Sequence, residues 1–500
     1  MGNKKYILSF LLLLAIVTAG ATEQERSLCS RLRHPYRVSV AESHRTGEVS
    51  RRAAEYVGEK RQLVFLVDFS DLYFLDADPH ALWDKIFNKE SFNESPFRGS
   101  VHDYFFDQSN GQFDLRFDVF YVHMNKKHEE YRSGDIDYYD DTRSGLLLTE
   151  ILDQKKNEIS NWSAYDWDYD GYVDQVLILY AGKGQNDSHD ATTIYPHQWS
   201  LSGHADAPYY REWGKPYSVV CGGTEYLVDA YGIFPELTQS GTYGSFGTLC
   251  HEFSHCLGLP DFYYGSSSSV VGSWDLMDKG NYNNGGYCPP NYSAHEKMVL
   301  GWVTPTELTS PVTITDMDTS KSYLIRNDGY SNEYYILEYR QQTGWDSSLP
   351  GSGVVVFHVD YDADIWKTGT PNSSTDKRYS IIPANNSSYY STAYEKNWAY
   401  PYGTNNSLTD TSSPKASLLH ENAIGTRLMG KPIENISVKD GVASFTFMGG
   451  STGIRDLRMS DDAESCFYNL QGQRVYIPLP GHIYIVKKKD GTFKKYVKTP

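Results

Sequence analysis

The sequence predicts an α+β fold over residues 61–304, an all-β sandwich over 305–448 and a small β unit over 449–500. In the first part, near-continuous apolar runs, which are typical of buried strands, alternate with amphipathic helical patterns. In the second part, short alternating runs are separated by clusters of turn residues, a pattern typical of β-sandwiches. A chain of 500 residues also exceeds what one hydrophobic core usually organises, so several units are expected.

Apolar periodicity and helix stop signals place the elements of the first unit. Gly111 and Gly258 each follow a helical pattern, and glycine readily adopts the left-handed conformation that ends helices. Strands are expected at 63–67, 113–117 and 176–180, and helices at 100–108, 145–156 and 243–259.

The N-terminal segment reads as a signal peptide over residues 1–21. Lys4 and Lys5 precede an apolar run at 7–17, and small residues follow at 19–21. The run is too short to span a membrane comfortably, and no other stretch is apolar enough to do so. We therefore expect an exported protein, secreted or attached to the cell surface, without a transmembrane segment in the mature chain. Residues 22–60 are polar and arginine-rich, as expected for a pro-segment or an exposed arm.

Composition argues against nucleic-acid binding. The 46 basic and 63 acidic side chains leave a formal charge of −17, whereas a duplex-binding protein needs a basic surface. Six cysteines are few for an exported chain of this size, and their spacing suggests neither a zinc ribbon nor a dense disulfide framework.

The motif His251-Glu252-Phe253-Ser254-His255 carries the chemistry. On a helix, positions i and i+4 share one face, so His251 and His255 can direct their imidazoles at one zinc ion. Glu252 can serve as general base toward a water at an open fourth position. Gly258 can turn the chain back so that Asp261 supplies a third ligand. A helix with two surface histidines is the alternative, and the glycine and aspartate at their offsets make it the weaker one.

A second segment, Gly272-Ser273-Trp274-Asp275-Leu276-Met277, follows the motif. A turn that contains Met277 can form a hydrophobic floor beneath the zinc ligands. By itself such a methionine is more often ordinary core.

These segments resemble the immune inhibitor A-like secreted metalloproteases, a metzincin-like family. The resemblance rests on HEFSHCLGLPDFY, GSWDLM and AHEKMVLGWV, with supporting segments such as SVHDYFFDQSNGQFDL, and covers about residues 65 to 440. It implies zinc ligands at His251, His255 and Asp261, a base at Glu252 and a Met-turn at Met277.

A run of acidic residues predicts a structural calcium site. In the pattern D-x-D-x-D-G-x-x-D, hard oxygen ligands alternate around a glycine turn, as calcium requires. The expected ligands are the carboxylates of Asp166, Asp168, Asp170 and Asp174 and the carbonyl of Tyr172. The twelfth position is Leu177 rather than glutamate, so this is not a complete EF-hand. An acidic surface turn is the alternative.

Other residues are weaker candidates. Tyr282 can act as an oxyanion donor but is expected to be a packing residue. His197 is expected to be a structural, hydrogen-bonded histidine, and His358 and Asp360 need no catalytic role. Cys250 and Cys256 are expected to be buried small residues or disulfide halves.

Cys29 lies in the arginine-rich arm, where its thiolate can occupy the open zinc position and keep a precursor latent. The pair Arg51-Arg52 suits removal of that arm by a trypsin-like protease. A disulfide or an ordinary thiol is the alternative for Cys29.

The C-terminal tail resembles the sorting domains of the type IX secretion system in Bacteroidetes. The resemblance rests on YNLQGQRV at 468–475, PGHIYI at 480–485 and the basic end, and it implies contact with an export machinery. A small β-domain that packs on the sandwich is the alternative.

Together these features predict a secreted zinc endopeptidase that acts on extracellular proteins or peptides. A surface adhesin or glycan-binding protein with a non-catalytic metal site is the alternative. Glu252 favours the enzyme, because a purely structural zinc does not need that carboxylate.

Overall fold

The structure is a computed structural model of the full chain. It describes residues 56–450 except 133–141, 205–213, 264–269, 368–370, 374–375 and 388–391, together with four strands of the C-terminal tail. The predicted signal peptide, Cys29 and the Arg51-Arg52 pair lie outside these residues.

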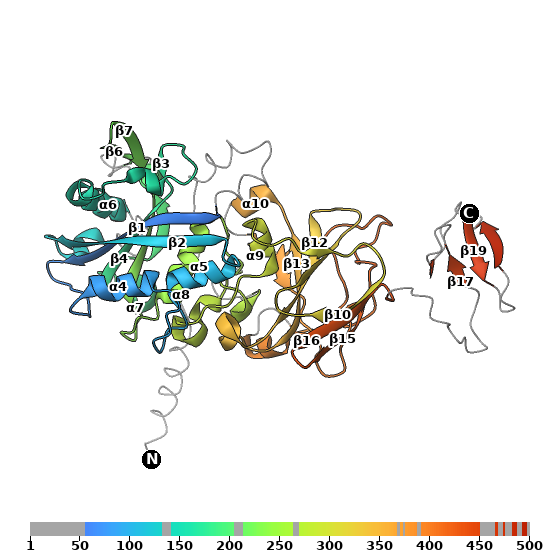
Figure 1. The fold of residues 1–500 in the computed structure, drawn as a ribbon. Helices are drawn as coiled ribbons and strands as arrows, with labels where there is room; N and C mark the ends of the chain where they lie inside the picture. The colour runs from blue at the N-terminus through green and yellow to red at the C-terminus, as the bar shows by residue number, and fades with distance from the viewer. Residues whose placement is uncertain are drawn as a thin grey trace, which may run out of the picture.

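A mixed five-stranded sheet forms the centre of the first unit (Figure 1). The strand order is β2-β1-β4-β8-β5; the first four strands are parallel, and only the edge strand β5 is antiparallel. The strands are β1 (Gly58–Phe69), β2 (Phe113–Met124), β4 (Val176–Lys183), β5 (His197–Ser200) and β8 (Ala230–Leu237). The three predicted strands lie within β1, β2 and β4, and each is longer than predicted because backbone pairing continues beyond its apolar run.

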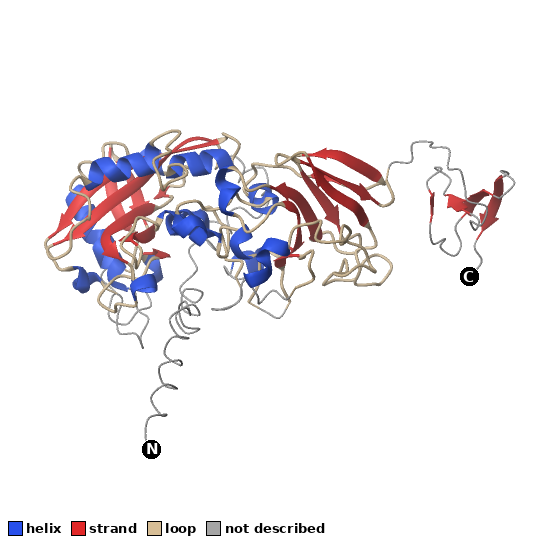
Figure 2. Cartoon of the chain, turned by 90° about the horizontal axis from the view of Figure 1, so that it is seen from below, coloured by secondary structure: helices blue, strands red, loops and turns tan. Residues whose placement is uncertain are grey.

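Helices cover both faces of this sheet, as Figure 2 shows. The α-helices of the described part of the chain, including those outside this sheet, are α4 (Pro79–Asn88), α5 (Val101–Gln108), α6 (Thr142–Lys155), α7 (Gln185–Ser188), α8 (Phe246–Cys256), α9 (Ala294–Val299) and α10 (Ala363–Lys367). The crossover from β1 to β2 and the crossover from β2 to β4 run in opposite directions along the sheet. Because such crossovers are right-handed, α4 and α5 lie on one face and α6 on the other.

Successive residues of each central strand point to opposite faces and enter different cores. Val64 and Leu66 pack in one core with α4, α5 and α8, whereas Leu63 and Phe65 pack in a second core with α6. Burial on both faces explains the near-continuous apolar run of β1.

Two further sheets follow C-terminally. The five-stranded sheet has the order β14-β13-β12-β11-β9, and the three-stranded sheet has the order β10-β16-β15. The strands are β9 (Thr306–Glu307), β10 (Val312–Met317), β11 (Ser322–Arg326), β12 (Glu333–Arg340), β13 (Gly353–Asp360), β14 (Tyr379–Ile381), β15 (Ile433–Lys439) and β16 (Val442–Phe447).

The five-stranded sheet has an apolar core on each face. Tyr335 and Leu337 face the three-stranded sheet, with which they share one core. Tyr334 and Ile336 point the other way and join the core that contains α8. The core beneath the helix of the HExxH motif therefore continues into the C-terminal sheet.

Smaller elements complete the described part of the chain. One small sheet has the order β3-β7-β6, and the tail forms a four-stranded sheet of order β18-β17-β19-β20. These strands are β3 (Tyr172–Val173), β6 (Tyr217–Cys221), β7 (Thr224–Val228), β17 (Cys466–Tyr468), β18 (Arg474–Val475), β19 (Ile483–Lys487) and β20 (Phe493–Val497). The 3-10 helices are η1 (His128–Tyr131), η2 (Trp162–Tyr165), η3 (Ser202–His204), η4 (Gly272–Trp274), η5 (Gly280–Gly286), η6 (Gly344–Ser348) and η7 (Thr392–Asn397). Among the described residues, no helix has the length and apolarity needed to cross a bilayer.

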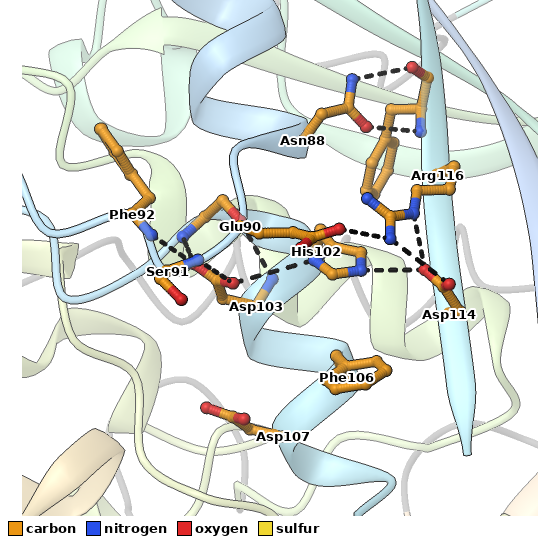
Figure 3. Close-up of polar contacts among 12 residues, drawn as sticks. Asn88, Glu90, Ser91, Phe92, His102, Asp103, Phe106, Asp107, Asp114 and Arg116 are labelled. Atoms are coloured by element: carbon orange, nitrogen blue, oxygen red, sulfur yellow. Dashed lines mark hydrogen bonds and ion pairs between the residues drawn. The ribbon is translucent and has the colours of Figure 1, made fainter. Parts of the chain in front are cut away.

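Asp103 fastens the start of α5 to the loop that follows α4 (Figure 3). Its carboxylate accepts hydrogen bonds from the backbone N–H groups of Ser91, Phe92 and Ser100, and Ser100 caps the helix in return. Burial opposes ionisation, but the side chain of His102 and these backbone donors lower the pKa of Asp103 to about 2. The stabilising form is therefore the carboxylate.

We expect Asp103→Asn to lower the free energy of unfolding by about 1–2 kcal/mol, because an amide leaves some of these donors without an acceptor. The folded pKa lies below the ordinary value, so this stabilisation is complete above about pH 4 and is lost as the pH falls toward 2. Urea unfolding between pH 2 and 7 measures both effects. Asp84→Asn, at an exposed position of α4, is the matched control, and an equal loss there would contradict the prediction.

Candidate metal centre

Helix α8 carries the HExxH motif directly after strand β8. The hydroxyl of Ser245 donates to the carbonyl of Glu236 and joins the helix start to the strand end. The helix is shorter than the predicted 243–259: it begins at Phe246 and ends at Cys256, and Gly258 then takes a positive φ of 100°. Apolar residues of the helix, such as Leu249 and Phe253, are buried in the core, which holds the helix against the sheet.

His251, His255 and Asp261 bring three ligand atoms together. The two Nε2 atoms are 3.2 Å apart, and Asp261 Oδ1 lies 3.1 Å from Nε2 of His251 and 3.3 Å from Nε2 of His255. Ligand atoms about 2.0–2.1 Å from a tetrahedral zinc are separated by about 3.3–3.4 Å. The triangle therefore has the dimensions of three corners of a zinc tetrahedron.

Both imidazoles are held in the tautomer that metal binding requires. Nδ1 of His251 lies 2.8 Å from the carbonyl oxygen of Leu276, and Nδ1 of His255 lies 2.7 Å from that of Leu259. Because a carbonyl only accepts, each Nδ1 carries the proton and each Nε2 presents a lone pair.

The chain after the helix returns Asp261 to the site. Gly258 reverses the direction, and the N–H of Leu259 donates to the carbonyl of Ser254. The next residue after the ligand, Phe262, donates its N–H to the carbonyl of Met277 at 2.9 Å. Met277 is fully buried in the same core, so the predicted Met-turn lies next to the ligand loop.

Glu252 lies beside the ligands. One oxygen of its carboxylate and one nitrogen of each histidine lie within 4.8 Å of one another, and Glu252 is 7% exposed. A carboxylate at this distance can act on a water beside the metal without itself being a required ligand.

The segment that carries this site matches a known family. Residues 52–304 match the family described as immune inhibitor A peptidase M6, catalytic domain. The chain belongs to this family.

The chain is also similar to two other proteins over part of its length. Immune inhibitor A of Bacillus thuringiensis subsp. alesti is 27% identical over 289 residues, which cover 48% of this chain and 40% of that protein. Pre-pro-metalloprotease PrtV of Vibrio cholerae serotype O1 is 24% identical over 289 residues, or 49% of this chain and 30% of that protein. The match thus spans less than half the length of either relative.

The acidic loop of this M6 family member brings three of its carboxylates together. Oxygens of Asp166, Asp168 and Asp174 lie within 4.8 Å of one another. Asp170 is not in this group; its Oδ1 accepts a hydrogen bond from the N–H of Tyr172. Burial, together with the charges of Asp168, Asp166 and Asp170, raises the pKa of Asp174 to about 8. A divalent cation would relieve this repulsion, so the three carboxylates fit calcium.

The remaining candidates are structural or differ from expectation. His197 is buried and hydrogen-bonded to Tyr195 and Ser144, and burial lowers its pKa to about 4. His358 pairs with Glu333 in the C-terminal sheet. The expectation that Tyr282 packs in the core is wrong: it is 64% exposed, because η5 presents it outward.

The two cysteines of α8 are buried thiols. Cys250 and Cys256 do not form a disulfide in the described part of the chain. Cys256 Sγ donates to the carbonyl of Glu252 at 3.6 Å. Burial raises the pKa of Cys250 well above the ordinary value, so its thiol stays protonated.

Sequence reasoning did not identify the groups that orient the ligands. These are the carbonyls of Leu259 and Leu276 and the carboxylate of Asp275, which accepts the N–H of Met277 at 2.8 Å. Asp275 belongs to the GSWDLM segment, so the sequence could have offered it as a candidate. The two carbonyls could not be predicted from the sequence, because every residue has a backbone carbonyl.

We expect Asp261→Asn to weaken zinc retention strongly, because it replaces a charged ligand by a neutral amide. Zinc content after dialysis, measured by atomic absorption, checks this. Asp229→Asn is the matched control, since Asp229 is equally buried but binds the backbone and hydroxyl of Ser202. The assignment of Asp261 would be refuted by full zinc content in Asp261→Asn.

Proposed function

We propose that this chain is an exported zinc endopeptidase that hydrolyses peptide bonds of extracellular proteins. The observation that carries this proposal is the ligand triangle of His251, His255 and Asp261 with Glu252 beside it, inside the segment that matches the peptidase family. Three protein ligands leave a fourth position for water, which is the arrangement of catalytic rather than structural zinc.

Each protein group has a distinct part in the proposed hydrolysis. Zinc held by His251, His255 and Asp261 would supply Lewis acidity, which would polarise a peptide carbonyl and lower the pKa of water. Glu252 accepts a proton from the attacking water and delivers it to the nitrogen of the leaving amine. His251 and His255 stay neutral and oriented because their Nδ1 protons are held by backbone carbonyls.

The finer description of the fold belongs to this proposal. A metzincin-like catalytic unit is supported by the extended motif and by Met277 beside the ligand loop. A β-sandwich over 305–448 is supported by the core that its two sheets share.

The proposed structural calcium site uses the same acidic loop. The carboxylates of Asp166, Asp168 and Asp174 already lie together and supply three ligands. Asp170 and the carbonyl of Tyr172 are the other proposed ligands, and another segment or water closes the shell. The loop precedes β4 and contains β3, which pairs with β7. Calcium would thus fasten the small sheet to the central one.

The proposed export of the protein and the proposed latency of its precursor are supported by features of the sequence. The segment at 1–21 supports export, and the similarity of the tail to sorting domains supports passage through a dedicated machinery to the cell surface or medium. One relative is named a pre-pro-metalloprotease, which supports residues 22–60 as a pro-segment. Within this segment, Cys29 is the proposed zinc-blocking thiol because of its position before the catalytic unit.

We expect Glu252→Gln to lower kcat/KM for casein by about 10²–10⁴-fold while zinc content stays unchanged, because the amide cannot accept the proton. Activity is measured after limited trypsin cleavage at the Arg51-Arg52 pair, which leaves strand β1 intact. Glu129→Gln, at an exposed position of the same unit, is the control. Activity that survives Glu252→Gln would overturn the proposed mechanism.

We expect calcium to raise the Tm of the chain, with stabilisation of about 2.7 kcal/mol at 100 times its dissociation constant. Asp174→Asn should abolish this rise because it removes the charge of one of the three clustered carboxylates. Asp190→Asn, in an exposed aspartate turn without this cluster, should retain it. Scanning calorimetry with and without calcium decides the question, and a rise that persists in Asp174→Asn argues against the site.

A further inference from the structure

The C-terminal five-stranded sheet reaches the zinc-site loops through Tyr379 of its edge strand β14. Tyr379 is fully buried, and its ring stacks on Phe262 with centroids 3.8 Å apart. Phe262 directly follows the zinc ligand Asp261 in the sequence. The sheet therefore contacts the ligand loop one residue from the ligand itself.

The hydroxyl of Tyr379 also contacts the Met-turn. It lies 2.9 Å from Asp275 Oδ2, while Asp275 Oδ1 accepts the N–H of Met277. Between these two residues, the carbonyl of Leu276 holds Nδ1 of His251 at 2.8 Å. Tyr379 thus contacts the carboxylate of Asp275, which shapes the Met-turn. The orientation of His251 depends on this turn.

Asn372 joins the two contacts. Its side-chain amide donates to the carbonyls of Phe262 and Tyr379, each at 2.7 Å, and its Oδ1 accepts the N–H of Tyr379 at 2.9 Å. Asn372 is fully buried. Its amide therefore has a fixed position from which it links the ligand loop to strand β14.

A third contact comes from Glu395 in η7. Its carboxylate accepts the N–H of Ser273, and its carbonyl accepts Nε1 of Trp274. Gly272 has a positive φ of 63°, and a Cβ there would lie 2.6 Å from this carboxylate. The turn can approach Glu395 only because this residue is glycine.

These contacts come from residues beyond 304, where the match to the catalytic-domain family ends. Outer groups that orient metal ligands commonly change metal affinity by about 10–100-fold when they are removed. The ligand loop and the Met-turn are both loops, whose geometry depends on what packs against them.

We propose that Tyr379 and Asn372 are positioning residues of the zinc site, so that the C-terminal sheet helps to fix the geometry of the metal centre. This inference rests on the proposed function, because it requires zinc at His251, His255 and Asp261. They act through Phe262 and Asp275 on the two loops that place the ligand atoms.

The sheet offers a matched control on its opposite face. Tyr335 is also fully buried, and its hydroxyl donates to the carbonyl of Ser417 at 2.6 Å in the core shared with the three-stranded sheet. Tyr335→Phe and Tyr379→Phe each remove one buried hydroxyl from the same sheet. Only Tyr379→Phe removes a contact to the zinc-site loops.

The experiment measures zinc binding by the full chain through competition with a chromophoric chelator, together with the rate of zinc release. We expect Tyr379→Phe and Asn372→Ala to raise the zinc dissociation constant by about 10–100-fold. Tyr335→Phe should leave it unchanged even if its Tm falls equally. Circular dichroism confirms that each variant is folded, and Asn372→Ala gives a second reading that leaves the tyrosine in place.

The outcomes separate this inference from the proposed function. Unchanged zinc affinity in both Tyr379→Phe and Asn372→Ala, or an equal loss in Tyr335→Phe, overturns the inference alone. A wild-type chain that takes up no zinc overturns the proposed function, and the inference with it. Weakened zinc binding confined to Tyr379→Phe and Asn372→Ala supports both.

Discussion

The hydrogen bond from Nδ1 of His251 to the carbonyl oxygen of Leu276, at 2.8 Å, joins the helix of the metal motif to the turn that faces it. It sets the imidazole tautomer, the ring orientation and the separation between helix and turn at once. The three distances between the ligand atoms are all between 3.1 and 3.3 Å, close to the separation around a tetrahedral zinc. A small displacement of any one of these atoms would remove this match. The surrounding structure therefore has to hold both sides of this bond in place.

Packing on both sides of the bond supplies that rigidity. Apolar residues of α8 lie in a core that reaches from the central sheet to strands β12, β13 and β14. The same core contains Met277, Phe262 and Tyr379, so helix, turn, ligand loop and C-terminal sheet share one densely packed interior. The residues of the metal site and the C-terminal sheet therefore pack in one core, although the sequence predicts them in separate units.

Much of the site was predictable because its signals are local. His251, Glu252 and His255 lie together because an α-helix brings i and i+4 to one face, and Gly258 permits the turn that returns Asp261. The strands within β1, β2 and β4 were predictable because burial on both faces requires continuous apolar runs. Helix ends were less predictable: α8 ends at Cys256, where local geometry and packing override the apolar pattern.

The HExxH motif, the helix that carries it and the apolar runs of the central strands were all readable along the chain, because each depends on residues that are close in sequence. The backbone carbonyls that orient the imidazoles, the acidic side chains that gather in the loop and the distant residues that support the turn became known from the folded chain alone. Asn372 is 110 residues from Phe262, and Tyr379 is 104 residues from Asp275. Contacts at such separations follow from how sheets and helices pack, because no periodicity along the chain encodes them.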